Sequence, residues 1–286
     1  MAHYLDPKND LTFKRVFGEH KHLCMSLINS MLPLKKPIVS IEYQTGELIP
    51  ELTDVFKNTI VDVRCTDEDR RQFIVEMQLY WSKSFKSRVL LNASKAYVMQ
   101  LDKATEFKLL QPVYALNFIN EIFEKSPEMK DEYYHYYKIV NIKNTEKQIE
   151  GLEFLFVELP KFKPQNRAER KLHDLWLRFL TEINENTKEI PQELLDNEFT
   201  REAVSYMEKA AYTKEQLATY DKWKIAAMTE RSAINDAKAE GRAEGEHKKA
   251  VAVAKKMRQR GVPIDEITEY TGLTVEQINE ILKKEA

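Results

Sequence analysis

The sequence contains little cysteine, little net charge and no long apolar run. Its two cysteines, Cys24 and Cys65, lie in apolar segments, which argues against a disulfide framework and favours a reducing compartment. A formal net charge of −2 creates no global attraction to DNA or to a membrane, so any anion-binding surface must be local. Because the sequence shows no stretch of about 18 apolar residues and no signal peptide, we expect a soluble cytoplasmic protein without a membrane partner.

Zinc-like spacing is also absent, since none of the six histidines pairs with a cysteine at the separation that a structural zinc site needs. Glycine is scarce, with 7 in 286 residues, whereas 31% of the residues are charged. This composition is typical of a helix-rich protein with long solvated helices. The length allows one large domain with an appendage, or two domains.

Residues 73–79 show the clearest pattern in the chain. Apolar residues alternate there with Glu76 and Gln78, so a strand would have one apolar face and one face with a carboxylate beside an amide. Residues 59–65 repeat the alternation, with Asp62 among the polar positions, and a polar, turn-like segment separates the two stretches. The two stretches are predicted to pair as a hairpin.

In such a hairpin Asp62 and Glu76 can meet on one face, and two carboxylates on adjacent strands are suited to bind a divalent cation. Spacing alone does not decide this, because a solvated sheet face would carry the same residues. The flanking side chains Ile60, Ile74 and Tyr80 are less typical of a solvated face, and they favour a covered cleft.

Periodicity predicts the remaining elements. Helices are expected at residues 10–18, 22–32, 84–107 and 168–183, after residue 191, and from residue 213 toward 260. Strands are expected at residues 38–43, 113–119, 133–142 and 152–159, with loops at 120–131 and 143–151. The first part of the chain is therefore α/β, and the part after residue 166 is almost entirely helical.

The chain is predicted to have four parts. They are an α/β core at 1–165, a helical extension at 166–235, a solvated helix or hinge at 236–260 and a small helix-turn-helix-like unit at 261–286. The hinge is inferred because residues 236–246 include no apolar residue larger than alanine. In the last unit, Gly272 is expected to end one helix, and Thr274 with Gln277 to form a capping box on the next.

A further pattern connects four parts of the chain: Asp6–Gly18, Val61–Val63, Phe73–Gln78 and Arg88. Together they resemble the recombination-promoting nuclease/transposase family, within the PD-(D/E)XK nuclease superfamily. The resemblance covers about residues 5–160. It implies a restriction-endonuclease-like α/β core, a mixed sheet with flanking helices, followed by an all-helical C-terminal region.

The resemblance also implies site residues. Asp62 matches the first acid of the superfamily and Glu76 the second, while Gln78 occupies the position that lysine usually holds. Asp62 and Glu76 would bind Mg²⁺ (or Mn²⁺), with the backbone carbonyl of Met77 as a further ligand. Asp10 on the first helix is another candidate ligand, although an N-cap role explains it equally well. Gln78 would forgo a lysine's charge but can orient a water or donate to a phosphate oxygen.

Other residues are candidates for contacts to nucleic acid. Lys14 and Arg88 are suited to DNA phosphates, although a solvated helix face explains them equally well. Gln100 would line the cleft, unless it packs or faces solvent.

The resulting hypothesis is an Mg²⁺-dependent DNA endonuclease that hydrolyses phosphodiester bonds in recombination or transposition. The alternative is a catalytically weak or inactive nuclease-fold module that binds DNA or protein partners. The C-terminal unit would either read DNA or form a homo-oligomer. Because its last helix has few early basic residues, oligomerisation or partner docking is favoured.

Overall fold

The computed structural model describes residues 3–44, 47–48, 59–60, 62–101, 106–164 and 171–283. The chain divides into two units, Met1–Lys224 and Ile225–Ala286. Among the helices of the described ranges, none has the length and apolarity needed to cross a bilayer.

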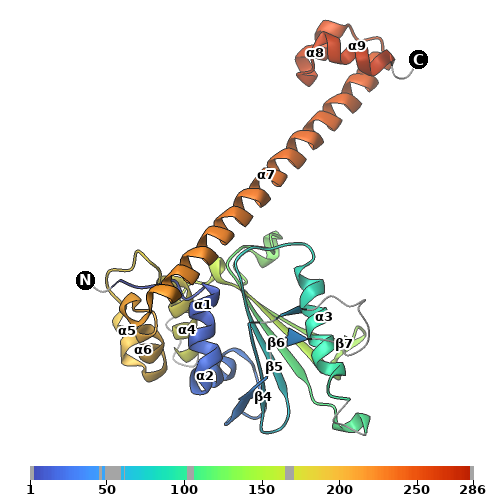
Figure 1. Ribbon diagram of the computed structural model, residues 1–286. Helices are drawn as coiled ribbons and strands as arrows, with labels where there is room; N and C mark the ends of the chain where they lie inside the picture. Colours follow the sequence, from blue (N-terminus) through green and yellow to red (C-terminus); the bar gives the residue numbers. More distant parts are fainter. Residues whose placement is uncertain are drawn as a thin grey trace. The chain divides into compact units, whose positions relative to one another are not determined.

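The first unit contains a mixed six-stranded sheet (Figure 1). In spatial order its strands are β1 (Ile41–Tyr43), β4 (Val63–Asp67), β5 (Gln72–Gln78), β6 (Val113–Ile119), β8 (Asn144–Glu158) and β7 (Tyr134–Asn141). The β1–β4, β4–β5 and β7–β8 pairs are antiparallel, whereas β5–β6 and β6–β8 are parallel. The short strands β2 (Glu47–Leu48) and β3 (Thr59–Ile60) pair separately. The predicted mixed sheet with flanking helices is confirmed.

Helices cover both faces of the sheet. One face packs against α3 (Phe85–Val98), whose buried side includes Val89, Ala93 and Ala96. The opposite face forms the larger core with α2 (Lys21–Met31) and α4 (Lys171–Glu182), around Phe17 and Trp176. Figure 1 shows α3 on the side of the sheet away from α1, α2 and α4. Both faces of β5 are therefore buried, which explains why its polar positions meet protein instead of bulk water.

Several shorter elements complete the first unit. They are α1 (Asp10–Phe13), the π-helical turn η1 (Lys14–Gly18), α5 (Gln192–Asp196), α6 (Glu198–Ser205) and the 3₁₀ turns η2 (Phe107–Leu109), η3 (Pro127–Met129), η4 (Leu159–Lys161) and η6 (Lys209–Ala211). Asn9 caps α1, since its side chain accepts a hydrogen bond from the Leu11 N–H. The N-cap is therefore Asn9 and not Asp10, the residue to which the sequence analysis gave a possible N-cap role.

Three predicted boundaries were wrong. The single strand predicted over residues 59–65 is divided by a bend at Asp62, so β3 pairs with β2 and only β4 joins the hairpin. The helix predicted to reach residue 107 ends at Val98. Residues 144–151, predicted as a loop, extend β8, because they pair with β7 across a shifted register.

The second unit includes most of α7 (Lys214–Gln259), together with α8 (Ile264–Thr271) and α9 (Val275–Lys283). Residues 236–246 continue α7 as an exposed helix. The small core of this unit buries Ala254, Ile267, Leu273 and Ile278. Gly272 ends α8 with a left-handed φ of 69°, and the Thr274 and Gln277 side chains each accept from the other's backbone N–H. The predicted helix end and capping box are confirmed.

Candidate active site

The structure brings Asp62 and Glu76 together at the end of the sheet where β4 begins and β5 ends. Asp62 occupies the bend before β4, and Val63 pairs with Val75 of β5. The Met77 N–H donates to Asp62 Oδ2 at 2.7 Å. This bond places the Asp62 carboxylate beside the residue that follows Glu76, so the bend that divides the predicted strand also directs the first acid toward the second.

Glu76 is 7% exposed and lies beneath α3. Asn92 of α3 donates from Nδ2 to Glu76 Oε1 at 3.1 Å. The pKa of Glu76 is raised to about 7, chiefly by burial and in addition by the charge of Asp62, while the Asn92 hydrogen bond and the Arg88 charge oppose the rise. Glu76 is therefore a carboxyl group whose negative charge the folded protein only partly compensates.

Asp62 is in a similar electrostatic position. Its pKa is raised to about 6, chiefly by burial and in addition by the charge of Asp10, while the Met77 N–H and the charges of Lys14 and Arg88 oppose the rise. Two neighbouring acids with raised pKa values repel each other when both are ionised. A divalent cation would relieve both, and carboxylate oxygens are the hard ligands that Mg²⁺ and Mn²⁺ prefer.

An unpaired oxygen of Asn92 also supports a cation site beside Asp62 and Glu76. Asn92 is 2% exposed, and its Oδ1 is buried without a hydrogen-bond partner while its Nδ2 binds Glu76. A buried amide oxygen normally has a partner. The residues present therefore fit a divalent cation, with Asp62 and Glu76 as charged ligands and a neutral oxygen nearby.

Gln78 is held at both ends of its amide group. Its Nε2 donates to the Tyr80 carbonyl at 2.8 Å, and its Oε1 accepts from Arg88 Nη2 at 2.5 Å. Arg88 lies in the first half of α3. The helix thus places a guanidinium group beside the Gln78 side chain.

The other predicted residues occupy different surroundings. Asp10 and Lys14 form an ion pair of 2.7 Å on α1 and η1, with each side chain 40% exposed, and both charges act on the pKa of Asp62. Gln100 instead binds the backbone N–H and carbonyl of Gln111. Its amide joins the end of α3 to the approach to β6, away from the strand end that carries Glu76.

Asn92 is the site residue that sequence reasoning missed. Its position was visible in the periodicity, because it is the polar residue among the buried positions Phe85, Val89, Ala93 and Ala96 of α3. A polar side chain on the buried face of a helix needs a partner. Looking for that partner on the neighbouring strand would have suggested Glu76.

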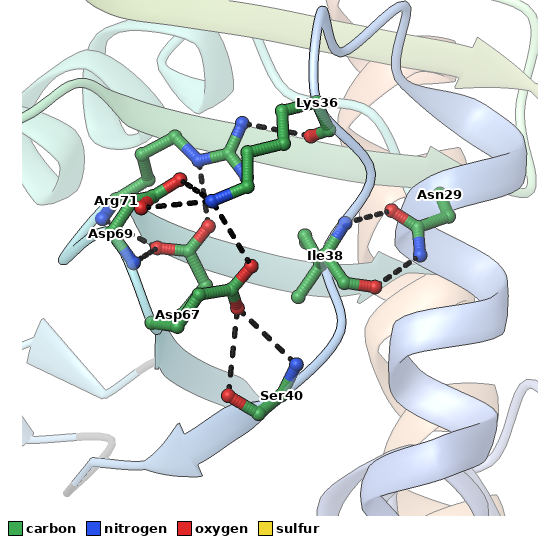
Figure 2. Close-up of polar contacts among 8 residues, drawn as sticks. Asn29, Lys36, Ile38, Ser40, Asp67, Asp69 and Arg71 are labelled. Atoms are coloured by element: carbon green, nitrogen blue, oxygen red, sulfur yellow. Dashed lines mark hydrogen bonds and ion pairs between the residues drawn. The ribbon is translucent and has the colours of Figure 1, made fainter.

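A second group of acids, Asp67, Glu68 and Asp69, lies in the turn between β4 and β5. Figure 2 shows Asp67 bonded to Arg71 and Asp69 bonded to Lys36, at 2.6 and 2.8 Å. Both oxygens of Asp67 accept hydrogen bonds from the turn. These acids already have cationic partners, so they fix the turn to the chain near Lys36, at the opposite end of the hairpin from Asp62.

Comparison with known families gives one result. Residues 7–237 match the model of a family described as PD-(D/E)XK nuclease family transposase. Comparisons with curated proteins and with solved structures gave no match.

Proposed function

Because the chain belongs to the PD-(D/E)XK nuclease family of transposases, we propose that it is a DNA endonuclease that depends on Mg²⁺ or Mn²⁺. The observation that supports this function best is the pair of acids formed by the buried Glu76 and the half-buried Asp62, which meet where β4 begins and β5 ends and whose pKa values are both raised. Such a pair is unfavourable by itself and becomes favourable once a cation is bound.

Asp62 and Glu76 would hold the cation, with the Met77 carbonyl and Asp10 as further candidate ligands. When bound, the cation neutralises charge on the scissile phosphate and lowers the pKa of a coordinated water. Asn92 keeps the Glu76 carboxylate in place through its hydrogen bond. The burial of Glu76 strengthens the electrostatic effect of the charged groups around it.

Gln78 and Arg88 would act together on the phosphate. Both ends of the Gln78 amide are engaged by Tyr80 and Arg88, so Gln78 mainly positions the guanidinium group. Arg88 retains further N–H donors for phosphate oxygens, since a guanidinium has five. A positive charge ~4 Å from the phosphate contributes roughly 1–4 kcal/mol at effective dielectric constants of 80 to 20. Lys14, whose charge lowers the pKa of Asp62, would be a second phosphate contact.

Plasmid cleavage tests this function. Supercoiled plasmid is incubated with purified protein and Mg²⁺ or Mn²⁺, and we expect relaxed and linear products. Glu76→Ala and Asp62→Ala should abolish cleavage. Asp69→Ala is the matched control, because it removes an acid of the β4–β5 turn and leaves the proposed site intact. Cleavage by the Glu76→Ala protein at the wild-type rate would refute the assignment.

The second candidate is a nuclease-fold module that binds DNA or protein with little or no catalysis. The absence of a lysine at position 78 favours it. Ca²⁺ or Mg²⁺ distinguishes the two functions by thermal unfolding: a working site is stabilised by the cation in wild type but not in Asp62→Ala, whereas an inactive scaffold shows no shift in either. A role in recombination or transposition would be expected of the active form.

For the C-terminal residues 261–286 we propose homo-oligomerisation in preference to DNA reading. The exposed surface of α9 carries Glu276, Asn279 and Glu280, which is a poor match to a negatively charged major groove. Light scattering of full-length protein and of a truncation at Asp236 tests this proposal. An unchanged oligomeric state would contradict it.

A further inference from the structure

Three aromatic rings form a surface next to the end of β5. Trp81 and Phe123 stack at a centroid distance of 4.2 Å with 17° between the ring planes. Lys86 Nζ lies over this group, 4.9 Å from the Phe123 centroid and 5.2 Å from that of Tyr137. We refer to Trp81, Phe123 and Tyr137 as the aromatic platform. Phe156, which is 4% exposed, contacts Phe123 and Tyr137 edge-on from below.

The aromatic platform is continuous with the candidate active site. Trp81 follows Gln78 by three residues, and its ring packs edge-on against Phe85 at 5.5 Å. The Arg88 guanidinium lies 4.9 Å from the same Phe85 ring while it binds Gln78. A line of contacts therefore runs from the proposed phosphate-binding group to the aromatic platform.

The fold holds the aromatic platform rigidly. The backbone N–H of Trp81 donates to a carboxylate oxygen of Glu121 at 2.7 Å. The Phe123 N–H donates to Glu158 at 2.5 Å. Glu158 is fully buried and is paired with Lys161 at 2.6 Å and with His135 at 2.9 Å. A buried and fully paired carboxylate thus fixes the segment that carries Phe123, although this segment has no regular secondary structure.

The rings are nevertheless available to a ligand. Trp81 and Phe123 are only partly buried, and Tyr137 is 41% exposed. The cation above them, Lys86, is exposed and on a flexible side chain. Rigid aromatic rings beside exposed Lys and Arg side chains are the combination by which proteins bind single-stranded nucleic acid, since bases stack on the rings and cations attract the phosphates.

We propose that the aromatic platform binds an unpaired nucleobase of a single-stranded DNA segment next to the phosphate that is cut. This inference rests on the proposed nuclease function and narrows its substrate to DNA with a single-stranded or frayed region. In a duplex the bases are stacked on one another inside the helix, so they cannot reach Trp81 or Tyr137. Lys86 would leave the ring faces and contact the adjacent phosphate.

The test measures binding of DNA to catalytically inactive protein. Glu76→Ala protein in EDTA is titrated into fluorescently labelled oligo(dT) and into a hairpin duplex of similar length, and anisotropy is recorded. We expect tighter binding of oligo(dT). Adding Tyr137→Ala to the Glu76→Ala protein should weaken oligo(dT) binding by about 5- to 150-fold, the range typical of one lost base–aromatic stack. The affinity for the duplex should not change. Phe107→Ala is the matched control, since Phe107 is 82% exposed and precedes β6.

A second, conservative variant tests the inference without removing an aromatic ring. Trp81→Phe keeps an aromatic ring, so it should retain oligo(dT) affinity while it loses the quenching of tryptophan fluorescence that stacking on Trp81 produces. Quenching that persists in Trp81→Phe would overturn the inference.

Two results separate this inference from the nuclease proposal. Should wild type cut plasmid while Tyr137→Ala and Phe107→Ala bind oligo(dT) alike, the aromatic platform is only the rim of the core and the nuclease function stands. Should wild type cut neither plasmid nor oligonucleotide, while Tyr137→Ala selectively weakens oligo(dT) binding, the base-binding surface stands and the nuclease function fails.

Discussion

Replacing Glu76 by glutamine is expected to stabilise the metal-free protein at pH 8. Glu76 is 7% exposed, and burial raises its pKa from 4.5 to about 7. Above pH 7 the folded chain holds a charge that burial disfavours, whereas the unfolded chain carries the same charge in water. A rise from 4.5 to about 7 corresponds to on the order of 3 kcal/mol. Because the new NH₂ group also needs a partner, we expect a net gain of about 1–3 kcal/mol.

The sign of the pH dependence follows from the raised pKa. Between about pH 4.5 and pH 7 the folded state retains the Glu76 proton, whereas the unfolded state loses it. The contribution of this group to stability is therefore full below about pH 4.5 and is lost as the pH rises to about 7. Wild type should lose stability across this window, and Glu76→Gln should lose less. At pH 5 the two proteins should therefore differ much less than at pH 8.

Urea unfolding in EDTA at pH 5 and pH 8 measures this difference. Tryptophan fluorescence is a suitable signal, because Trp176 is fully buried in the unit that contains Glu76. Glu128→Gln is the matched control, since Glu128 is exposed and its replacement should change neither value. An equal loss of stability in Glu76→Gln at both pH values would refute the reasoning. Addition of Mg²⁺ should stabilise wild type and leave Glu76→Gln almost unchanged.

Three further predictions concern the groups around the site. Arg88→Ala should slow plasmid cleavage about 5- to 900-fold, from the ~1–4 kcal/mol of its charge. Gln78→Lys alone should not exceed the wild-type rate, because the new ammonium would repel Arg88. Asp67→Ala should lower the free energy of unfolding by roughly 1–3 kcal/mol without altering the Mg²⁺-induced thermal shift; a reduced shift would make the β4–β5 turn a metal site. Glu158→Ala should cost about 3–5 kcal/mol in denaturant unfolding, since it removes the carboxylate partner of the buried Lys161 ammonium, and a loss below about 1 kcal/mol would contradict the role given to this carboxylate.

Much of the sheet could be predicted because its strands have simple patterns. Residues 113–119 are apolar except for Asn117 and residues 73–79 alternate cleanly, and β6 and β5 lie at these positions. The extension of β8 was not predictable, because residues 144–151 are polar and exposed and become a strand only through pairing with β7. Such pairing is a long-range property that local periodicity does not report.

In the candidate site, too, some features could be predicted from the sequence and others could not. The positions of Asp62 and Glu76 followed from two neighbouring strand patterns, and the structure places these acids together. The bend at Asp62 could not be read locally, since it is maintained by the Met77 N–H of the adjacent strand. The bond between Gln78 and Arg88 is likewise a contact between a strand and a helix. Sequence identified the candidate residues, and tertiary packing determined which partner each one has.

The geometry of α3 explains how a helix can replace a side chain missing from a strand. Arg88 and Asn92 are four residues apart and project from one side of α3, about 6 Å apart along its axis. Their partners Gln78 and Glu76 are two residues apart on β5, about 7 Å apart along the strand. The helix runs back along the strand, so the earlier helical residue meets the later strand residue. Because the two spacings match, one helix face can orient the Glu76 carboxylate and place a positive charge beside Gln78 at the same time. A chain with glutamine at position 78 therefore does not have to lose the positively charged side chain beside that position, provided that the helix after the strand carries an arginine one turn before its buried asparagine.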